Sequence, residues 1–192
     1  MKAPYITDFH CPFEPMKNKN WKTEVAKPHG HVPVPESELN PEMLDWFEDR
    51  GFWLKNADIF CSPPNFTLGI HVDGTRMDNR IATNWAYEEE TDPGVMHWWK
   101  PKPGFENPSD LKPEEHGAYS ISTTPYALAW IDSQCDLLYS STVGAPSLVN
   151  IGIPHSMSNG RNQRFAVSVT WVDYKNADME WEQAYERLVA NA

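Results

Sequence analysis

The chain has 192 residues, a length typical of one domain with a substantial hydrophobic core. Its formal net charge is −11, which argues against the phosphate backbone of nucleic acid as the habitual partner. No apolar run approaches the roughly 20 residues that a membrane-spanning helix needs, so we expect no membrane association. Three cysteines, Cys11, Cys61 and Cys135, have no C-x-x-C spacing, and the first residues lack the apolar core of a signal peptide. These features argue against a disulfide framework or a zinc site and predict a cytoplasmic protein.

The first forty residues differ in composition from the rest of the chain. Residues 1–40 are rich in proline, lysine and histidine and show no helical or strand period, so we expect an arm that wraps the core or covers the mouth of a site. A helix follows, because Asn40 is a good helix cap and Pro41 suits the first helical position. Gly51 is a natural stop for this helix. Its apolar residues recur at helical spacing: Met43, Trp46 and Phe47.

Most of the remaining chain favours strands. Seventeen prolines and ten glycines are spread along the sequence, as in loop-rich β proteins. Apolar or alternating runs predict strands over residues 66–72, 80–87, 119–122, 126–131, 137–139, 146–155 and 164–171. A last helix is expected from a cap at Asn176 or Asp178 to about Val189. No internal linker or repeat is visible, so residues 1–192 are expected to form a single domain.

A candidate metal site begins at the end of the strand predicted over residues 66–72. His71 and Asp73 are two residues apart, and side chains at this spacing on a strand point to the same face. A histidine and a carboxylate arranged in this way supply two of the three ligands of a 2-His-1-carboxylate facial triad, which binds non-haem iron(II). The H-x-D spacing alone is a weak signal, so its meaning depends on a second histidine further along the chain.

That histidine is His155, which ends the apolar run predicted as a strand over residues 146–155. Nine residues later, Arg164 opens another strand. A strand ending in H-x-D, a distant strand ending in histidine, and an arginine about ten residues beyond it resemble the 2-oxoglutarate/Fe(II)-dependent oxygenases. The resemblance covers roughly residues 58–175.

This resemblance implies a mostly β fold, a double-stranded β-helix (jelly-roll, cupin-like) with a few flanking helices. It also implies that His71, Asp73 and His155 bind Fe(II), with 2-oxoglutarate as cosubstrate and O2 as oxidant. In such enzymes, 2-oxoglutarate is converted to succinate and CO2 while the substrate is hydroxylated. The protein itself contributes positioning and the exclusion of side reactions.

Arg164 is the predicted partner of the distal carboxylate of 2-oxoglutarate, because a guanidinium pairs with a carboxylate through charge-assisted hydrogen bonds. The alternative is an ordinary surface arginine on a strand. Strand parity places Ser168 on the same face as Arg164, so its hydroxyl is a further candidate cosubstrate contact. Many members of the family carry a serine two residues after the arginine, where this chain has Ala166.

Two more polar residues are candidate cosubstrate ligands. Arg80 lies nine residues after His71, a placement similar to that of an arginine in the aspartyl/asparaginyl β-hydroxylase branch. The similarity is partial, because that branch has glycine at the position of Asp73. The alternative for Arg80 is an ion pair with Asp78 in the loop. Asn84 either contacts the C1 carboxylate of 2-oxoglutarate or satisfies a backbone group.

The favoured function is therefore a dioxygenase that hydroxylates a small molecule or the side chain of an amino acid or peptide. Two alternatives stay open: a catalytically silent jelly-roll module that binds a metal or an acidic metabolite, and, as a minor option, an oxygenase acting on flipped nucleobases. Four aromatic residues are candidate walls of the substrate pocket: Trp85, Trp98, Trp99 and Tyr139.

Overall fold

The computed structural model describes residues 5–24, 30–87, 92–106, 128–144 and 146–190. The strands are β1 (Ile6–Asp8), β2 (Gly30–Pro33), β3 (Trp53–Ser62), β4 (Thr67–Val72), β5 (Ile81–Tyr87), β6 (Val95–Pro101), β7 (Leu128–Trp130), β8 (Cys135–Thr142), β9 (Ser147–Asn150), β10 (His155–Ser158) and β11 (Arg164–Val172). The helices are α1 (Trp21–Glu24), α2 (Pro41–Glu48) and α3 (Trp181–Tyr185), and a π-helical turn over Glu186–Ala190 continues α3. Short 3₁₀ turns occupy Glu36–Glu38 and Asp132–Gln134.

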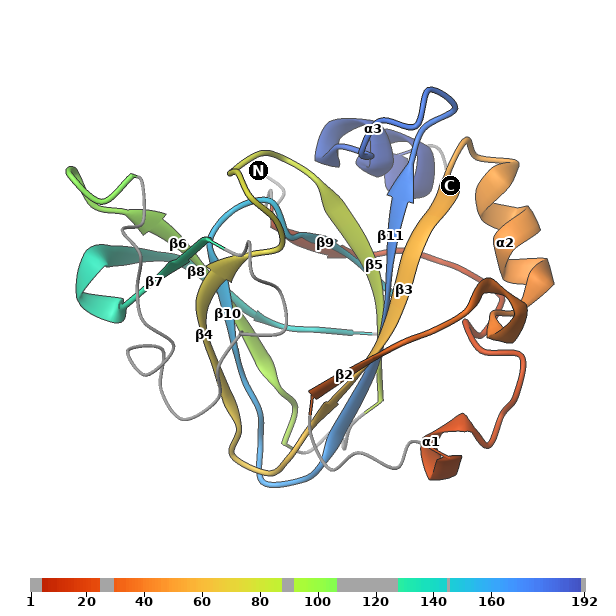
Figure 1. Ribbon diagram of the computed structural model, residues 1–192, viewed down its shortest axis with the longest axis horizontal. Helices are drawn as coiled ribbons and strands as arrows, with labels where there is room; N and C mark the ends of the chain where they lie inside the picture. Colours follow the sequence, from red (N-terminus) through yellow and green to blue (C-terminus); the bar gives the residue numbers. More distant parts are fainter. Residues whose placement is uncertain (1–4, 25–29, 88–91, 107–127, 145, 191–192) are drawn as a thin grey trace.

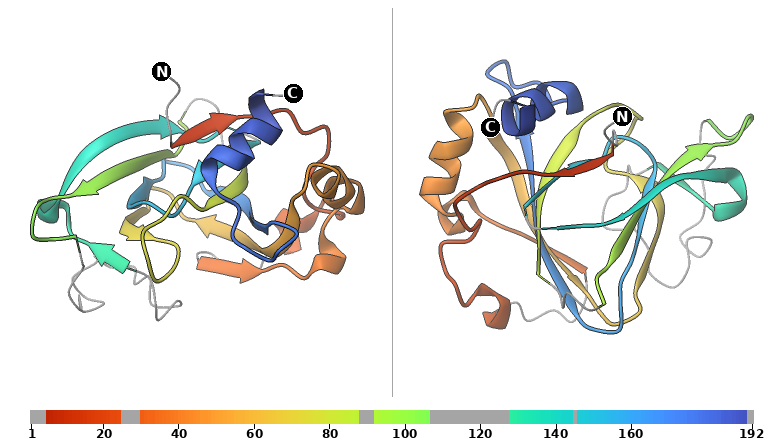
Figure 2. Two further views of the ribbon diagram at one scale, coloured as in Figure 1. Left: turned by 90° about the horizontal axis from the view of Figure 1, so that it is seen from above. Right: turned by 180° about the vertical axis from the view of Figure 1, so that it is seen from behind.

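The described residues form a mostly β structure, as the composition predicted, and its strands make two antiparallel sheets (Figure 1). The larger sheet has the strand order β1-β9-β5-β11-β3-β2, and the smaller one has the order β7-β4-β10-β6-β8. Helices α2 and α3 lie on the outer side of the larger sheet in both views (Figures 1 and 2). The face of the larger sheet that these helices leave open turns toward the smaller sheet.

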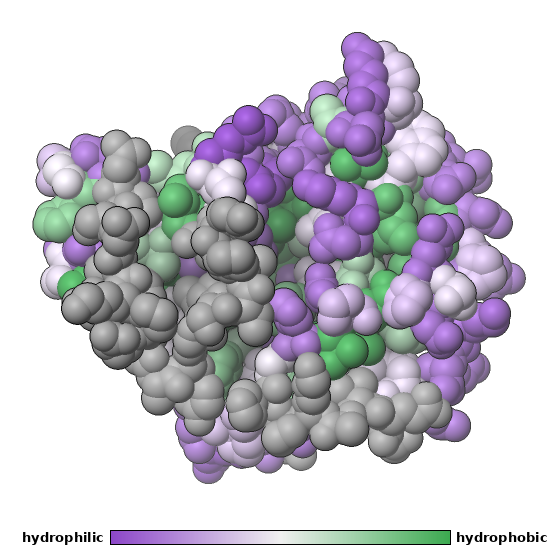
Figure 3. Space-filling model, viewed as in Figure 1, coloured by the Kyte–Doolittle hydropathy of each residue, from purple (hydrophilic) through white to green (hydrophobic). Residues whose placement is uncertain are grey.

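Three clusters of buried hydrophobic residues stabilise the described part of the chain, and two of them join its layers. In the first, between the helices and the larger sheet, Phe47 of α2 stacks on Trp171 of β11 with ring centroids 4.1 Å apart. The second lies between the two sheets and contains Val149 from the larger sheet and Trp98 and Met157 from the smaller one. The outer side of α2 is polar, and hydrophilic residues dominate that edge of the molecule in Figure 3.

The N-terminal arm contributes both edges of the larger sheet. β1 pairs with β9 at one edge, and β2 pairs with β3 at the other. Both strands precede residue 58, where the predicted core began, so the larger sheet extends beyond the predicted boundary. The arm also packs on the sheet further along, since the Tyr87 hydroxyl donates a hydrogen bond to Glu14 Oε2 at 2.5 Å.

The helix predicted after Asn40 is confirmed. Asn40 Oδ1 accepts a hydrogen bond from the Glu42 backbone N–H at 3.0 Å, and Gly51 after the helix has φ +77°. The last helix begins later than predicted, at Trp181. Neither predicted cap serves it, because the cap position is Glu180, and Asp178 forms an ion pair with Lys55 instead. Among the described residues, no helix combines the length and the apolar character needed to cross a bilayer.

The prediction of one strand over residues 146–155 is wrong, because two strands occupy this stretch. β9 belongs to the larger sheet and β10 to the smaller, so residues 151–154 cross between the sheets. Pro154 cannot donate a ladder hydrogen bond, and Gly152 packs against Asp78 with no room for a Cβ. His155 therefore begins a strand. The strand predicted over residues 119–122 lies outside the described residues.

Candidate metal centre

His71 and His155 lie directly opposite each other on neighbouring antiparallel strands. β4 pairs with β10 so that His71 faces His155, and the two ring centroids are 4.4 Å apart. The register shifts between His155 and Met157, which leaves Leu68 opposite Met157. This irregularity places Leu68 and His71, three residues apart, on the same face between the sheets.

Backbone carbonyl groups fix the orientation of both imidazole rings. His71 Nδ1 lies 2.8 Å from the carbonyl oxygen of Gly69, and His155 Nδ1 lies 2.9 Å from that of Ile153. A carbonyl oxygen can only accept, so each Nδ1 carries the hydrogen. In the neutral ring, Nε2 then presents a lone pair, as a metal-ligating histidine requires.

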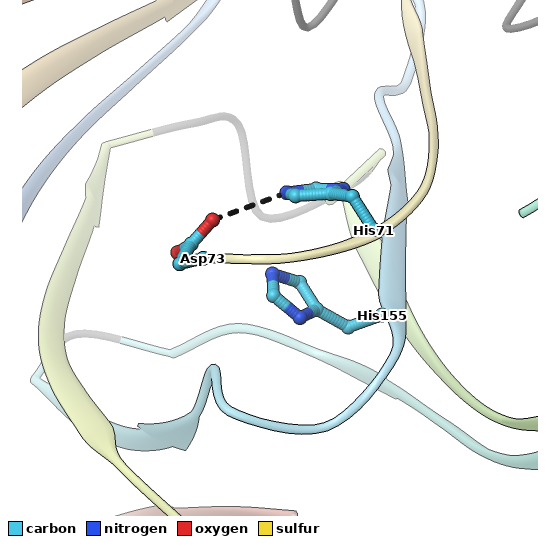
Figure 4. A group of neighbouring side chains, drawn as sticks. All are labelled: His71, Asp73 and His155. Atoms are coloured by element: carbon cyan, nitrogen blue, oxygen red, sulfur yellow. Dashed lines mark ion pairs between the residues drawn. The ribbon is translucent and has the colours of Figure 1, made fainter. Parts of the chain in front are cut away.

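Asp73 completes the group from the first position after β4. Its Oδ1 lies 3.3 Å from His71 Nε2, and the three side chains converge on one point (Figure 4). One ligand atom from each residue lies within 4.8 Å of the others. The histidines are buried whereas the Asp73 side chain is 45% exposed, so the group is open on the carboxylate side. This triad could hold a metal ion.

The charges of the three side chains are coupled. Burial and the repulsion of His71 lower the pKa of His155 to about 4. Burial also disfavours a charged His71, but the hydrogen bond and charge of Asp73 outweigh it and raise the pKa of His71 above its ordinary value. Burial opposes ionisation of Asp73, yet the hydrogen bond from His71 and nearby positive charge lower its pKa. At pH values below the raised pKa of His71 and above that of His155, the metal-free site therefore holds an imidazolium–carboxylate pair beside a neutral imidazole.

Arg164 is buried at the start of β11, with 4% of its surface exposed, which excludes the surface-arginine alternative. Its Nη1 donates a hydrogen bond to the sulfur of Met157 at 2.8 Å. Met157 lies two residues after His155 on the same face of β10, a spacing of about 7 Å along a strand. The guanidinium therefore contacts the same-face neighbour of a triad histidine. Met157 was not predicted as a site residue. Its position two residues after His155 on a strand would have indicated that both lie on the same face.

Ser168 and Asn84 lie opposite each other on β11 and β5. The pairing of β11 with β5 is regular from Phe165 to Thr170, so Ser168 lies on the same face as Ala166. Asn84 Oδ1 is buried, and it has no hydrogen-bond partner among the described residues. This face of the larger sheet turns toward the triad-bearing sheet.

Arg80 makes the contacts expected of the loop-pairing alternative. Its Nε and Nη2 donate to the two carboxylate oxygens of Asp78 at 2.7 and 2.6 Å. Its Nη1 donates to the backbone oxygen of Asp73 at 2.9 Å. The guanidinium thus holds the loop that carries the triad carboxylate.

The four aromatic residues predicted as walls of the substrate pocket lie in different parts of the fold. The prediction for Trp85 is wrong, because it packs edge-on against Phe47 in the core beneath the helices. Trp99 lies in a separate cluster and donates to Ser156 Oγ at 2.9 Å. Trp98 lies opposite His155 on β6 and donates to the Asn150 backbone oxygen. Tyr139 is 36% exposed, and its ring centroid lies 6.0 Å from that of Trp98.

Comparison with known proteins assigns no family to the chain. No protein-family model matches it, and no curated protein sequence does. A functional assignment therefore depends on the geometry of the triad and of the side chains around it.

Proposed function

We propose that this protein is an Fe(II)- and 2-oxoglutarate-dependent dioxygenase that hydroxylates a small molecule or the side chain of an amino acid or peptide. The observation that supports this most is the convergence of His71, Asp73 and His155 within 4.8 Å on one face of a sheet. Two imidazoles and one carboxylate on one side of a ferrous ion leave three positions exchangeable. We further propose that the two facing sheets form a double-stranded β-helix.

The donor set suits ferrous iron. Both histidines offer Nε2 because their Nδ1 hydrogens are held by backbone carbonyls. A metal ion would replace the proton that His71 shares with Asp73, so the carboxylate would keep a positive charge beside it. None of the three described cysteines belongs to this group. A soft thiolate site is thereby less suitable here than an N/O site.

Arg164 supports the choice of cosubstrate. A buried guanidinium that contacts Met157, the same-face neighbour of His155 on β10, suits a dicarboxylate that reaches from the metal into the space between the sheets. Asn84 and Ser168 line the same face of the larger sheet and could hydrogen-bond its oxygens. When bound, iron and 2-oxoglutarate would supply oxidative decarboxylation and the transfer of one oxygen atom to a C–H bond. The chain's own residues orient these groups and limit the entry of water.

The test is turnover of the cosubstrate. With Fe(II), O2 and ascorbate, the protein should release succinate from 2-oxoglutarate above a no-enzyme control even without its substrate. Asp73→Ala should abolish this release, because it removes a metal ligand. Asp136→Ala is the matched control, since Asp136 is a 67% exposed carboxylate on β8 and should retain wild-type release.

The same assay separates the enzyme from the silent module. Succinate release equal to that of Asp73→Ala, in wild-type protein shown to bind both iron and 2-oxoglutarate, would contradict the proposal and favour the module. Candidate substrates can be ranked by how far they stimulate release, starting with free amino acids and short peptides.

A further inference from the structure

The loop between β4 and β5 carries the triad carboxylate at one end and Arg80 at the other. Within it, the Asp78 carboxylate accepts from Arg80 Nε, Arg80 Nη2 and the Arg80 backbone N–H at 2.6 to 3.1 Å. Arg80 Nη1 donates to the Asp73 backbone oxygen, and Nη2 also donates to the Arg76 backbone oxygen at 3.1 Å. Only 14% of the Arg80 side chain is exposed. One guanidinium thus fixes the loop at three separate points.

Two glycines make room for these contacts. Gly74 has φ +136°, and a Cβ there would overlap Arg80 Nη1. A Cβ on Gly152 would overlap Asp78 Oδ1 and lie 2.6 Å from the Asp78 backbone oxygen. Both positions therefore bring the backbone of a ligand-bearing segment against the Arg80–Asp78 pair. Gly74 follows the ligand Asp73, and Gly152 precedes the ligand His155 by three residues.

Backbone hydrogen bonds join the two ligand-bearing segments at the same place. The Asp73 N–H donates to the Ile151 oxygen at 3.1 Å, and the Asp78 N–H donates to the Gly152 oxygen at 2.8 Å. In return, the Gly152 N–H donates to the Arg80 oxygen at 3.2 Å. The position of Asp73 relative to the segment that leads into His155 thus depends on the shape of the 73–80 loop.

We propose that Arg80 and Asp78 form a clamp that positions Asp73 for metal binding, so that Arg80 controls retention of the metal rather than anchoring 2-oxoglutarate. This inference rests on the proposed metal centre. Arg80 is a positioning residue, because it acts through the backbone of Asp73 and through Asp78. Loss of a group that orients a metal ligand typically weakens metal binding by about 10- to 100-fold.

The experiment measures Mn(II) binding to the full chain by the electron paramagnetic resonance signal of free Mn(II), without 2-oxoglutarate. Arg80→Gln should raise the dissociation constant about 10- to 100-fold, and Arg80→Lys should recover part of the loss. Arg161→Gln is the matched control, because the Arg161 side chain is 83% exposed and pairs with Asp92, outside the clamp and its loop. Among the residues that the structure describes, no contact joins Arg161 to the 73–80 loop, so its variant should bind Mn(II) like the wild type.

A second variant tests the clamp without replacing Arg80. Gly74→Ala keeps both charged side chains and displaces the guanidinium, so it should also weaken Mn(II) binding. Visible spectra of the Co(II)-loaded proteins should change in band shape for Arg80→Gln and Gly74→Ala but not for Arg161→Gln. Melting temperatures of the metal-free variants identify any that fail to fold. If Arg80→Gln is unfolded, the Gly74→Ala result decides.

Four outcomes would overturn the inference. Wild-type Mn(II) affinity in Arg80→Gln, together with weaker 2-oxoglutarate binding, would make Arg80 a cosubstrate anchor. Wild-type Mn(II) affinity in a folded Gly74→Ala variant would show that displacing the guanidinium does not matter. Equal weakening by Arg161→Gln would indicate a general effect of positive charge. A wild-type protein that binds no Mn(II), Co(II) or Fe(II) would refute the proposed function as well, whereas the first three outcomes leave that function intact.

Discussion

Replacing Arg164 tests the cosubstrate part of the proposed function most directly. Arg164 is 4% exposed, and its Nη1 contacts Met157, the inner-face neighbour of His155 on β10. Arg164→Gln keeps a polar side chain that fills most of the space but removes the positive charge. The variant should bind Mn(II) normally, because Arg164 is not a metal ligand, and should bind 2-oxoglutarate more weakly.

The size of the loss follows from the interaction removed. A hydrogen bond to a charged group contributes about 1.5–3 kcal/mol, and each 1.4 kcal/mol corresponds to a factor of about ten in affinity. Losing one such contact therefore raises the dissociation constant of 2-oxoglutarate about 10- to 100-fold. Burial favours the upper part of this range, since solvent screens a buried charge weakly. Arg164→Lys should recover only part of the affinity, because an ammonium cannot match the planar fork of a guanidinium.

The assay is an anaerobic titration of the Fe(II) protein with 2-oxoglutarate, followed through the visible charge-transfer band of the keto-acid chelate. Arg161→Gln is the matched control: Arg161 is three residues away, its side chain is 83% exposed, and it pairs with Asp92. This control should titrate like the wild type. An Arg164→Gln variant that is folded, binds Mn(II) and titrates like the wild type would refute the role of Arg164.

Three further predictions concern protonation and stability. Because the pKa of His155 is lowered to about 4 and that of His71 is raised, metal binding near pH 5.5 should release about one proton per ion, and affinity should fall as pH decreases through the pKa of His71. Calorimetry in buffers of different ionisation enthalpy measures this release, and two protons per ion would contradict the assignment. Asn40→Ala should lower the free energy of unfolding by about 0.5–2 kcal/mol through loss of the helix cap, and an unchanged urea midpoint would exclude that role. Phe47→Ala should lower it by about 3–5 kcal/mol, because the ring stacks on Trp171 in the core, and a loss below about 1 kcal/mol would contradict this packing.

Local signals in the sequence predicted much of what surrounds the triad. The cap at Asn40, the strand that ends near His71 and the strand that begins at Arg164 each depend on residues within a few positions of one another. The spacing of His71 and Asp73 was sufficient to place both on one face. By contrast, no local pattern indicated β1 and β2, because their partners β9 and β3 lie far away in the sequence and supply the hydrogen bonds.

The prediction for Trp85 was wrong because the sequence does not show which layer each face of a strand contacts. Asn84 and Trp85 are neighbours on β5 and cannot both face the site, since successive strand residues point to opposite faces. The sequence shows which residues share a face of β5, but it does not show which sheet or helix packs against each face. The structure assigns Trp85 to the helices and leaves Asn84 on the face toward the triad-bearing sheet.

Arg80 shows where knowledge of a loop's shape becomes necessary. From the sequence, an ion pair with Asp78 and a contact with the cosubstrate were equally compatible with an arginine nine residues after His71. The choice depends on the path of the backbone at Gly74, whose positive φ lets the guanidinium reach the Asp73 backbone oxygen. Four of the five N–H groups of the Arg80 guanidinium donate to the loop, so Arg80 could pair with a carboxylate through two hydrogen bonds only by giving up one of these contacts. Metal retention and cosubstrate binding would then compete for one side chain, whereas assigning the cosubstrate to Arg164 lets both occur together.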